Sequence, residues 1–189
     1  MTSTLNAVLA EGVHEAARAL LGCTLLVDGV GGVLVEVEAY APDDPASHSY
    51  GGPKRGNATM SGPSGHLYVY RSYGIHWCAN VVCCEAGTGA AVLLRALEPT
   101  HGVDEMRERR GLDDVRLLCS GPGRLTQALG LSAVHDGLPL DRAPFLLEPP
   151  AEPADVVTGP RVGISRAVEL PWRYSLRGSP FVSRPRPRA

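Results

Sequence analysis

The sequence predicts a single domain of the α+β class, in which helices accompany a β-sheet built from hairpins. The length of 189 residues is enough to bury one hydrophobic core and short for two domains. Segments that alternate apolar and polar residues follow one another across short turns, as antiparallel strands do. The 22 Gly and 16 Pro residues predict many turns and long connections.

The N-terminal part of the chain reads as a helix followed by a hairpin. Residues 5–21 carry apolar side chains at helical spacing, and Gly22 supplies a stop. Two strands, at residues 23–27 and 33–40, are separated by a turn that contains Asp and Gly. Residues 41–66 are rich in Pro, Gly and Ser. We therefore expect a long loop there, of a length usually found where loops are functional or disordered.

A second hairpin is predicted from residues 67–72 and 77–82. The turn between these strands would lift Tyr73, Ile75 and His76 out on its tip. Exposed apolar side chains on a tip are costly unless something receives them, and a wedge into stacked DNA bases is one such use. The alternative is a tip that folds down onto the domain's own surface.

The C-terminal half continues with a buried strand at residues 90–97. This strand carries Arg95, for which a buried position requires a partner such as Glu98 or Glu38. Two helices follow: a short charged one at residues 102–110, and one that Ser120 caps and Gly130 ends. The remaining apolar runs predict three closing strands, at residues 145–147, 162–165 and 173–176.

The strand that ends VLVEVEAY is the strongest candidate for a functional site. Its pattern places Glu36, Glu38 and Tyr40 on one face, and His48 follows eight residues after the tyrosine. A carboxylate on a rigid strand, beside an aromatic ring and a histidine, could set a base next to a flat ligand. On pattern alone, the simpler interpretation is a half-exposed strand whose acidic face is solvated.

Composition restricts the class of protein. The five cysteines include an adjacent pair and no Cys-x-x-Cys motif, so we expect reduced, mostly buried thiols rather than disulfides or a zinc site. No apolar stretch is long enough for a membrane span, and Glu11 and Glu15 interrupt what would be a signal peptide. The sequence thus predicts a soluble intracellular protein, in the cytoplasm and nucleoid of a bacterium or the nucleus of a eukaryote.

The charge distribution favours a polyanionic partner although the net charge is −2. Residues 51–80 carry three basic side chains and no acid, and residues 166–189 carry six Arg against one acid. The candidate phosphate contacts are Lys54, Arg55, Arg71 and Arg124, the last at the start of a predicted helix. Residues 184–189 form a separate basic tail beyond a domain of residues 1–183, and this tail either contacts a polyanion or only aids solubility.

Several motifs, in this order, resemble the alkyladenine (3-methyladenine) DNA glycosylase family. They are VEVEAY from Val35, His48-Ser49, LYVYRSYG from Leu67, Cys78-Ala79-Asn80, VLLRALEP from Val92, CSGPGRLTQALG from Cys119, RVGI from Arg161 and RGSPFVS from Arg177. The resemblance runs from about residue 16 to residue 183. It implies a compact domain around a curved, mainly antiparallel sheet, with a protruding hairpin that enters the minor groove.

The resemblance also implies roles for individual residues. Glu38 matches the general base that activates water, Arg95 the arginine that holds that water and carboxylate, and Val162 a position whose carbonyl touches the water. Base-binding positions are matched by Tyr40 on one face of the flipped base, by His48 and Tyr70 on the other, and by Asn80, which rejects guanine. Tyr73 matches the residue that fills the gap in the duplex, with Ile75 and His76 beside it. Glu36 remains the alternative to Glu38 as base.

The implied activity is excision of damaged purines from double-stranded DNA by a monomeric enzyme that needs no cofactor or metal. A cationic alkylated purine leaves without a protein acid, so one carboxylate suffices. Strand cutting typically needs an amine nucleophile, and the chain has one lysine, Lys54, so we expect a monofunctional glycosylase. Three alternatives are a lesion-binding protein that shields damage without cutting, a predominantly helical helix-hairpin-helix glycosylase and, more distantly, a formyltransferase-like sheet domain that binds RNA.

Overall fold

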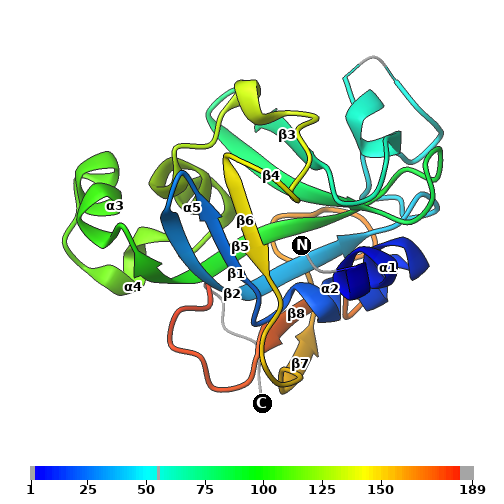
Figure 1. Cartoon of the computed structure of the whole chain (residues 1–189). Coiled ribbons are helices and arrows are strands. Elements are labelled where there is room, and N and C mark those ends of the chain that lie inside the picture. Colours follow the sequence, from blue (N-terminus) through cyan, green and yellow to red (C-terminus); the bar gives the residue numbers. More distant parts are fainter. Residues whose placement is uncertain (1–2, 55, 184–189) are drawn as a thin grey trace.

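The computed structural model describes residues 3–54 and 56–183, and it has an antiparallel sheet with helices at both ends (Figure 1). The sheet contains eight strands: β1 (Thr24–Val27), β2 (Val30–Tyr40), β3 (Leu67–Ser72), β4 (His76–Cys83), β5 (Ala90–His101), β6 (Phe145–Glu148), β7 (Val156–Gly159) and β8 (Arg173–Leu176). The helices are α1 (Ser3–Glu11), α2 (Val13–Leu20), α3 (Val103–Arg110), α4 (Val115–Leu118) and α5 (Pro122–Leu129), with short 3₁₀ turns at Ala58–Ser61 and Ala133–His135. The α+β prediction is confirmed.

Strand β2 is the centre of the sheet. The strand order is β3-β4-β5-β2-β1-β6, and β8 adds to β2 and carries β7 on its other side. The start of β2 lies in close contact with the backbones of β1 and β5. A Cβ on Gly31 would lie 1.9 Å from the carbonyl oxygen of Leu25, and a Cβ on Gly32 would lie 1.9 Å from that of Glu98. Such close approach requires glycine. The second half of β2, which carries the two glutamates, is therefore fixed at the middle of the molecule.

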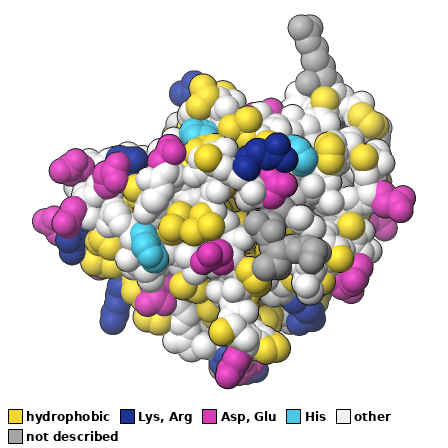
Figure 2. Space-filling view, in the orientation of Figure 1, with side chains coloured by type: hydrophobic (Ala, Val, Ile, Leu, Met, Phe, Trp, Pro, Cys, Tyr) yellow, Lys and Arg dark blue, Asp and Glu magenta, His cyan; other side chains and the backbone are white. Residues whose placement is uncertain are grey.

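The helices gather at opposite ends of the sheet. Figure 1 shows α1 and α2 on one side, beside β7 and β8, and α3, α4 and α5 on the other. Buried side chains of α2 and α5 join those of the sheet in one large core, in which Leu, Val and Ala supply most of the volume. Figure 2 shows acidic and basic side chains close together over α3, where Asp104 pairs with Arg107 and Glu105 pairs with Arg109. This mixture leaves α3 without a strong charge of one sign.

Both predicted hairpins form. The β1–β2 pair and the β3–β4 pair are antiparallel, as alternation and turn residues indicate. At the tip of β3–β4, Tyr73 and Ile75 are 88% and 77% exposed, so the alternative of a tip folded onto the domain is wrong. The expectation for His76 was also wrong, because it is the first residue of β4, half-buried against α5. There a Cβ on Gly123 would lie 2.5 Å from its ring.

Other boundaries differ from the sequence predictions for local reasons. The predicted N-terminal helix is two helices, since extended backbone at Gly12, with φ −177°, interrupts it. The residue at the N-cap of α5 is Gly121 rather than Ser120. Residues 162–165 form no strand; the neighbouring segment Val156–Gly159 does, as β7, paired with β8. The sheet of eight strands contradicts the helix-hairpin-helix alternative.

The prediction of mostly buried, reduced thiols is confirmed in the described chain. Cys23, Cys78, Cys83 and Cys119 are buried, Cys84 is half-buried, and all five are free thiols. Between residues 3 and 183, with residue 55 left out, no helix combines the length and apolar character needed to cross a lipid bilayer. The predicted basic tail at residues 184–189 lies outside the described residues.

Candidate active site

Glu38 lies fully buried in the middle of the sheet, with both carboxylate oxygens engaged. Its Oε1 accepts a hydrogen bond of 2.7 Å from the amide of Val162 and pairs with Nη1 of Arg95 at 3.2 Å. Its Oε2 accepts a hydrogen bond of 2.9 Å from the hydroxyl of Tyr40. The simpler interpretation, a solvated acidic strand face, is therefore wrong. At Val162 the backbone N–H contacts this carboxylate, and the expected contact of its carbonyl with a water molecule stays a prediction.

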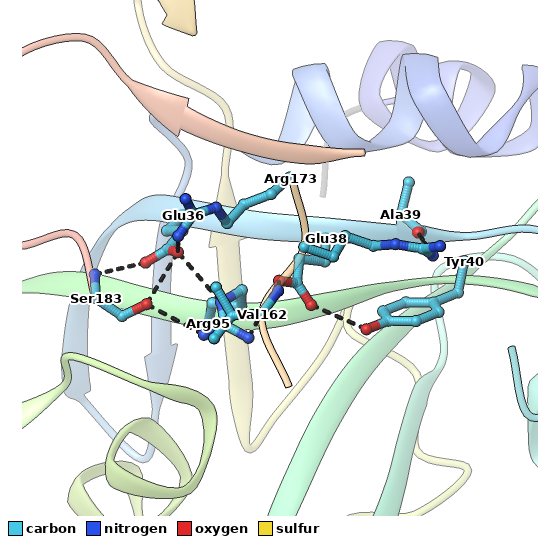
Figure 3. A network of polar contacts seen from close by, with 9 residues as sticks. Glu36, Glu38, Ala39, Tyr40, Arg95, Val162, Arg173 and Ser183 are labelled. Carbon is cyan, nitrogen blue, oxygen red and sulfur yellow. Dashed lines mark hydrogen bonds and ion pairs between the residues drawn. The ribbon is translucent and has the colours of Figure 1, made fainter. Parts of the chain in front are cut away.

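Arg95 joins the two glutamates of β2 from the neighbouring strand β5 (Figure 3). Its Nε donates to Oε1 of Glu36 at 3.2 Å, while Nη1 faces Glu38. Arg95 is 4% exposed, and its partners are these strand carboxylates; no ion pair with Glu98 is present in the described chain. The prediction that a buried Arg95 needs a carboxylate partner holds, with Glu36 added to Glu38.

Glu36 is enclosed on the side away from Glu38. Ser183 donates its amide to Oε2 at 2.6 Å and its hydroxyl to Oε1 at 2.9 Å, and Arg173 on β8 lies 3.4 Å from Oε1 (Figure 3). The two carboxylates and two guanidiniums are all buried. Their formal charges cancel when both carboxylates are ionised, which is the arrangement that buried charges require.

The surroundings of Glu38 shift the pKa of its carboxyl in opposite directions, and the net effect raises it. Burial raises the pKa of its carboxyl above that of an ordinary glutamate, whereas Arg95, the Val162 amide and the Tyr40 hydroxyl each lower it, and Glu36 raises it further. A carboxylate with a raised pKa is a stronger base than a solvent-exposed one, and its hydrogen bonds fix its orientation. Glu38 is thus an oriented base at the floor of the site.

A cavity of about 910 Å³ opens above Glu38. Tyr40, Arg95 and Val162, which all contact Glu38, line it, whereas Glu38 itself lies beneath them. Of the residues around Glu36, only Arg95 lines the cavity within the described chain, so Glu38 is the better placed of the two glutamates. The described lining residues include four arginines, Arg71, Arg95, Arg124 and Arg166, and no carboxylate.

Aromatic side chains form the walls of this cavity. Tyr40 at the end of β2 lines it together with His48, Tyr68 and Tyr70. Tyr68 and Tyr70 stack with ring centroids 5.5 Å apart, and the rings of His48 and Tyr70 form a T-shaped pair with centroids 4.4 Å apart. Burial lowers the pKa of His48, and Lys54 lowers it further, so the imidazole is neutral near pH 7. A flat ligand would meet π surfaces here.

The remaining predicted base-binding residue, Asn80, also lines the cavity. Asn80 lies on β4 and is 5% exposed. Its side-chain nitrogen Nδ2 donates a hydrogen bond of 3.1 Å to the backbone carbonyl of Tyr68. Tyr68 was not among the predicted site residues, although its place two residues before Tyr70 in LYVYRSYG, on the same face of a strand, offered a signal. Its hydroxyl lies 3.1 Å from Nδ1 of His48 and holds the histidine wall in place.

The predicted DNA contacts divide into two groups. Arg71, Arg124, Tyr73 and His76 line the cavity mouth, while Lys54 is exposed and is not among the lining residues. Ile75 is exposed beside Tyr73 without lining the cavity, and Arg55 lies outside the described residues.

Sequence reasoning missed a buried ion pair behind Tyr40. Arg161 donates to both oxygens of Asp44, at 3.0 Å for Nη2 to Oδ1, and to the carbonyl of Ala39 at 3.0 Å. Both side chains are fully buried. The pair ties the loop that carries His48 to the loop that carries Val162. Its partners are 117 positions apart, so no local pattern reveals it.

Comparison with known proteins finds DNA glycosylases both among family models and among individual relatives. The model of the methylpurine-DNA glycosylase family matches residues 7–180. A protein of Rhodopseudomonas palustris strain HaA2 is 63% identical over 93% of this chain and 88% of its own length. Proteins of Nitrosospira multiformis and Agrobacterium fabrum are 61% and 58% identical, each over 90% of this chain and 89% and 86% of their own lengths. All three bear the name "Putative 3-methyladenine DNA glycosylase".

Proposed function

Since the chain belongs to the methylpurine-DNA glycosylase family, we propose that it excises damaged purines from DNA with Glu38 as the base that activates water. The protein is a hydrolase of the N-glycosidic bond, a DNA glycosylase. The substrate is a double-stranded DNA that contains an alkylated purine. The target nucleotide leaves the base stack and enters the cavity, because its glycosidic bond is out of reach inside a duplex.

The observation that carries this proposal is the position of one buried carboxylate below an aromatic cavity. Tyr40, Arg95 and Val162 separate Glu38 from the open space by a single layer of side chains and backbone. A water molecule that enters this layer meets an oriented base. As the bond to the base lengthens, the sugar gains oxocarbenium character, and the same carboxylate stabilises that positive charge.

The walls of the cavity suit the flipped base of the substrate, and its mouth suits the phosphate backbone. Tyr40, His48 and Tyr70, which line the cavity, offer π surfaces for the flipped purine. Asn80 lines the same cavity, and its proposed role is to crowd the 2-amino group of guanine. Arg71, Arg124 and Arg166 give the mouth a positive charge that attracts the phosphate backbone. Tyr73, exposed on the tip of the β3–β4 hairpin, fills the gap that the flipped nucleotide leaves.

The preferred substrate is a purine that alkylation has made cationic. Such a base departs without protonation, and aromatic walls attract an electron-poor ring. Hypoxanthine and ethenoadenine are further candidate substrates. The chain has one lysine, Lys54, exposed and outside the cavity lining, so the product is an abasic site with the strand intact.

The Glu38→Gln variant tests the mechanism. Gln keeps the size of the side chain but cannot accept a proton, so single-turnover excision of 7-methylguanine should fall at least about a hundredfold. Binding to the lesion duplex should remain close to wild type, as measured by fluorescence anisotropy. Retained excision in Glu38→Gln would show that the base is another group, with Glu36 the first to test.

The competing function is a lesion-binding protein that shields damage without cutting. The paired Glu38 and Arg95 favour catalysis, because a shielding protein gains nothing from a buried charged group below its ligand. Release of free 7-methylguanine by the wild-type protein, in excess over a buffer control, separates the two functions. We further propose that the protein acts as a monomer in the compartment that holds the DNA.

A further inference from the structure

A guanidinium group lies directly behind the aromatic wall that Tyr40 forms. The Cζ atom of Arg161 is 4.7 Å from the centroid of the Tyr40 ring, and it is also 5.1 Å from the centroid of the Trp172 ring. Arg161 is buried and is not among the cavity-lining residues, whereas Tyr40 is. The ring face that Arg161 covers is therefore the face turned away from the cavity.

The position of this cation affects the opposite face of the ring. The face of a tyrosine ring is electronegative, and that charge attracts cations. A guanidinium stacked on one face draws electron density toward itself and makes the other face less negative. Asp44 balances the formal charge, but it binds the edge of the guanidinium rather than the ring, so the positive group is the one in contact with Tyr40.

We propose that Arg161 is a specificity-determining residue that lowers the preference of the cavity for cationic purines over neutral ones. The inference rests on the proposed function, in which Tyr40 stacks on the flipped base. With Arg161 behind it, Tyr40 attracts an alkylated, cationic purine less strongly and accepts a neutral purine such as hypoxanthine relatively better. Arg161 acts through Tyr40 and does not touch the substrate.

The test compares excision of a cationic and a neutral lesion by matched variants. The readout is the ratio of single-turnover rates for 7-methylguanine and hypoxanthine in the same duplex sequence. The double variant Arg161→Met with Asp44→Asn removes both members of the buried pair, so no charge is left without a partner. Its ratio should rise by roughly two- to fivefold, the range expected for loss of an opposing cation–π contribution.

A second variant should move the ratio in the opposite direction. Asp44→Asn alone keeps the cation behind Tyr40 and removes the group that balances it, so the ratio should fall below wild type. This comparison also stands if the double variant fails to fold. Trp172→Phe is the matched control, because it alters the packing of a second aromatic ring on Arg161 without a change in charge. Its ratio should equal that of wild type.

Each outcome decides between the alternatives. If the variants lower both rates by the same factor, Arg161 only positions the loops around it and the proposal is wrong. A ratio that shifts equally in Trp172→Phe would also overturn it, since packing rather than charge would be the cause. If the wild-type protein excises neither lesion, the proposed function itself fails, which is a different result from an unchanged ratio.

Discussion

At the scale of single residues, Glu36 contributes to the pKa of Glu38. The two carboxylates share Arg95, and Glu36 raises the pKa of Glu38 by repulsion in addition to the larger effect of burial. A general base must be ionised, so excision should decline as the pH falls through the pKa of Glu38. Because burial raises that pKa, the acid limb of the rate profile should lie at higher pH than for an ordinary glutamate.

The variant Glu36→Gln should shift this acid limb to lower pH. It removes a negative charge near Glu38 and leaves Arg95 to pair with Glu38 alone, and both effects lower the pKa of Glu38. Single-turnover excision of 7-methylguanine between pH 4 and pH 8 measures the shift. Glu98→Gln is the control, since Glu98 is on β5 but outside this network. An acid limb that stays in place in Glu36→Gln would show that a group other than Glu38 sets the profile.

Residue-level reasoning from the sequence found Glu38, Tyr40, His48 and Arg95 because short motifs carry them. It did not find Arg161, although that residue starts one of the motifs. The importance of Arg161 depends on Asp44, on the carbonyl of Ala39 and on two aromatic rings, which only the folded chain brings together. Side chains whose partners are distant in sequence leave no periodic signal.

At the scale of elements, the β3–β4 hairpin presents Tyr73 to solvent. Tyr73 and Gly74 both have positive φ angles, +50° and +68°, and a non-glycine residue in this conformation is uncommon. The conformation directs an 88% exposed ring outward. Behind the tip, His76 packs on Gly123 of α5, so the hairpin is supported by the helix that begins near the cavity mouth.

The variant Tyr73→Ala should weaken flipping and leave the chemistry intact. Without the ring, the gap in the duplex is unfilled, so affinity for the lesion duplex should fall about tenfold, as for loss of one base–aromatic stack. Excision from single-stranded DNA, where no gap needs filling, should be unchanged. Val134→Ala, which truncates another exposed apolar side chain outside the cavity lining, is the control. Unchanged duplex affinity in Tyr73→Ala would reject the wedge.

Both hairpins and the helix ends at Gly111 and Gly130 were predictable, because alternation and stop residues are local features. Strand β7 was not, because its four residues follow a Pro- and Glu-rich stretch and become a strand only by pairing with β8. The break at Gly12 was missed for a similar reason, since helical spacing continues on both sides of it.

At the scale of the whole molecule, the site is assembled from segments that span most of the chain. Ser183 holds Glu36 from the C-terminal side, and its neighbour Val182 packs on Val35 of β2 and Ala96 of β5. The segment that ends the described chain is therefore part of the support for Arg95 and, through it, for Glu38.

The variant Ser183→Ala should destabilise the fold measurably. It removes the hydroxyl that donates to Glu36 and accepts from Arg95, while the hydrogen bond that the backbone N–H of residue 183 donates to Glu36 remains. Loss of a buried hydrogen bond to charged groups should lower the free energy of unfolding by about 1.5–3 kcal/mol. Urea denaturation measures this change, with Thr88→Ala as an exposed hydroxyl control. A stability equal to that of wild type would mean that Ser183 gives no support to the pair.

Arg95, shared between two acids, also limits how sequences of this kind can diverge. A lineage that loses either acid leaves the buried guanidiniums of Arg95 and Arg173 with one carboxylate between them, and one that loses Arg95 leaves Glu38 without its ion-pair partner and Glu36 with Arg173. Single replacements at these three sites should thus be harmful in isolation and tolerated only in combinations. A mutational library that samples them one at a time would miss whatever working alternatives exist.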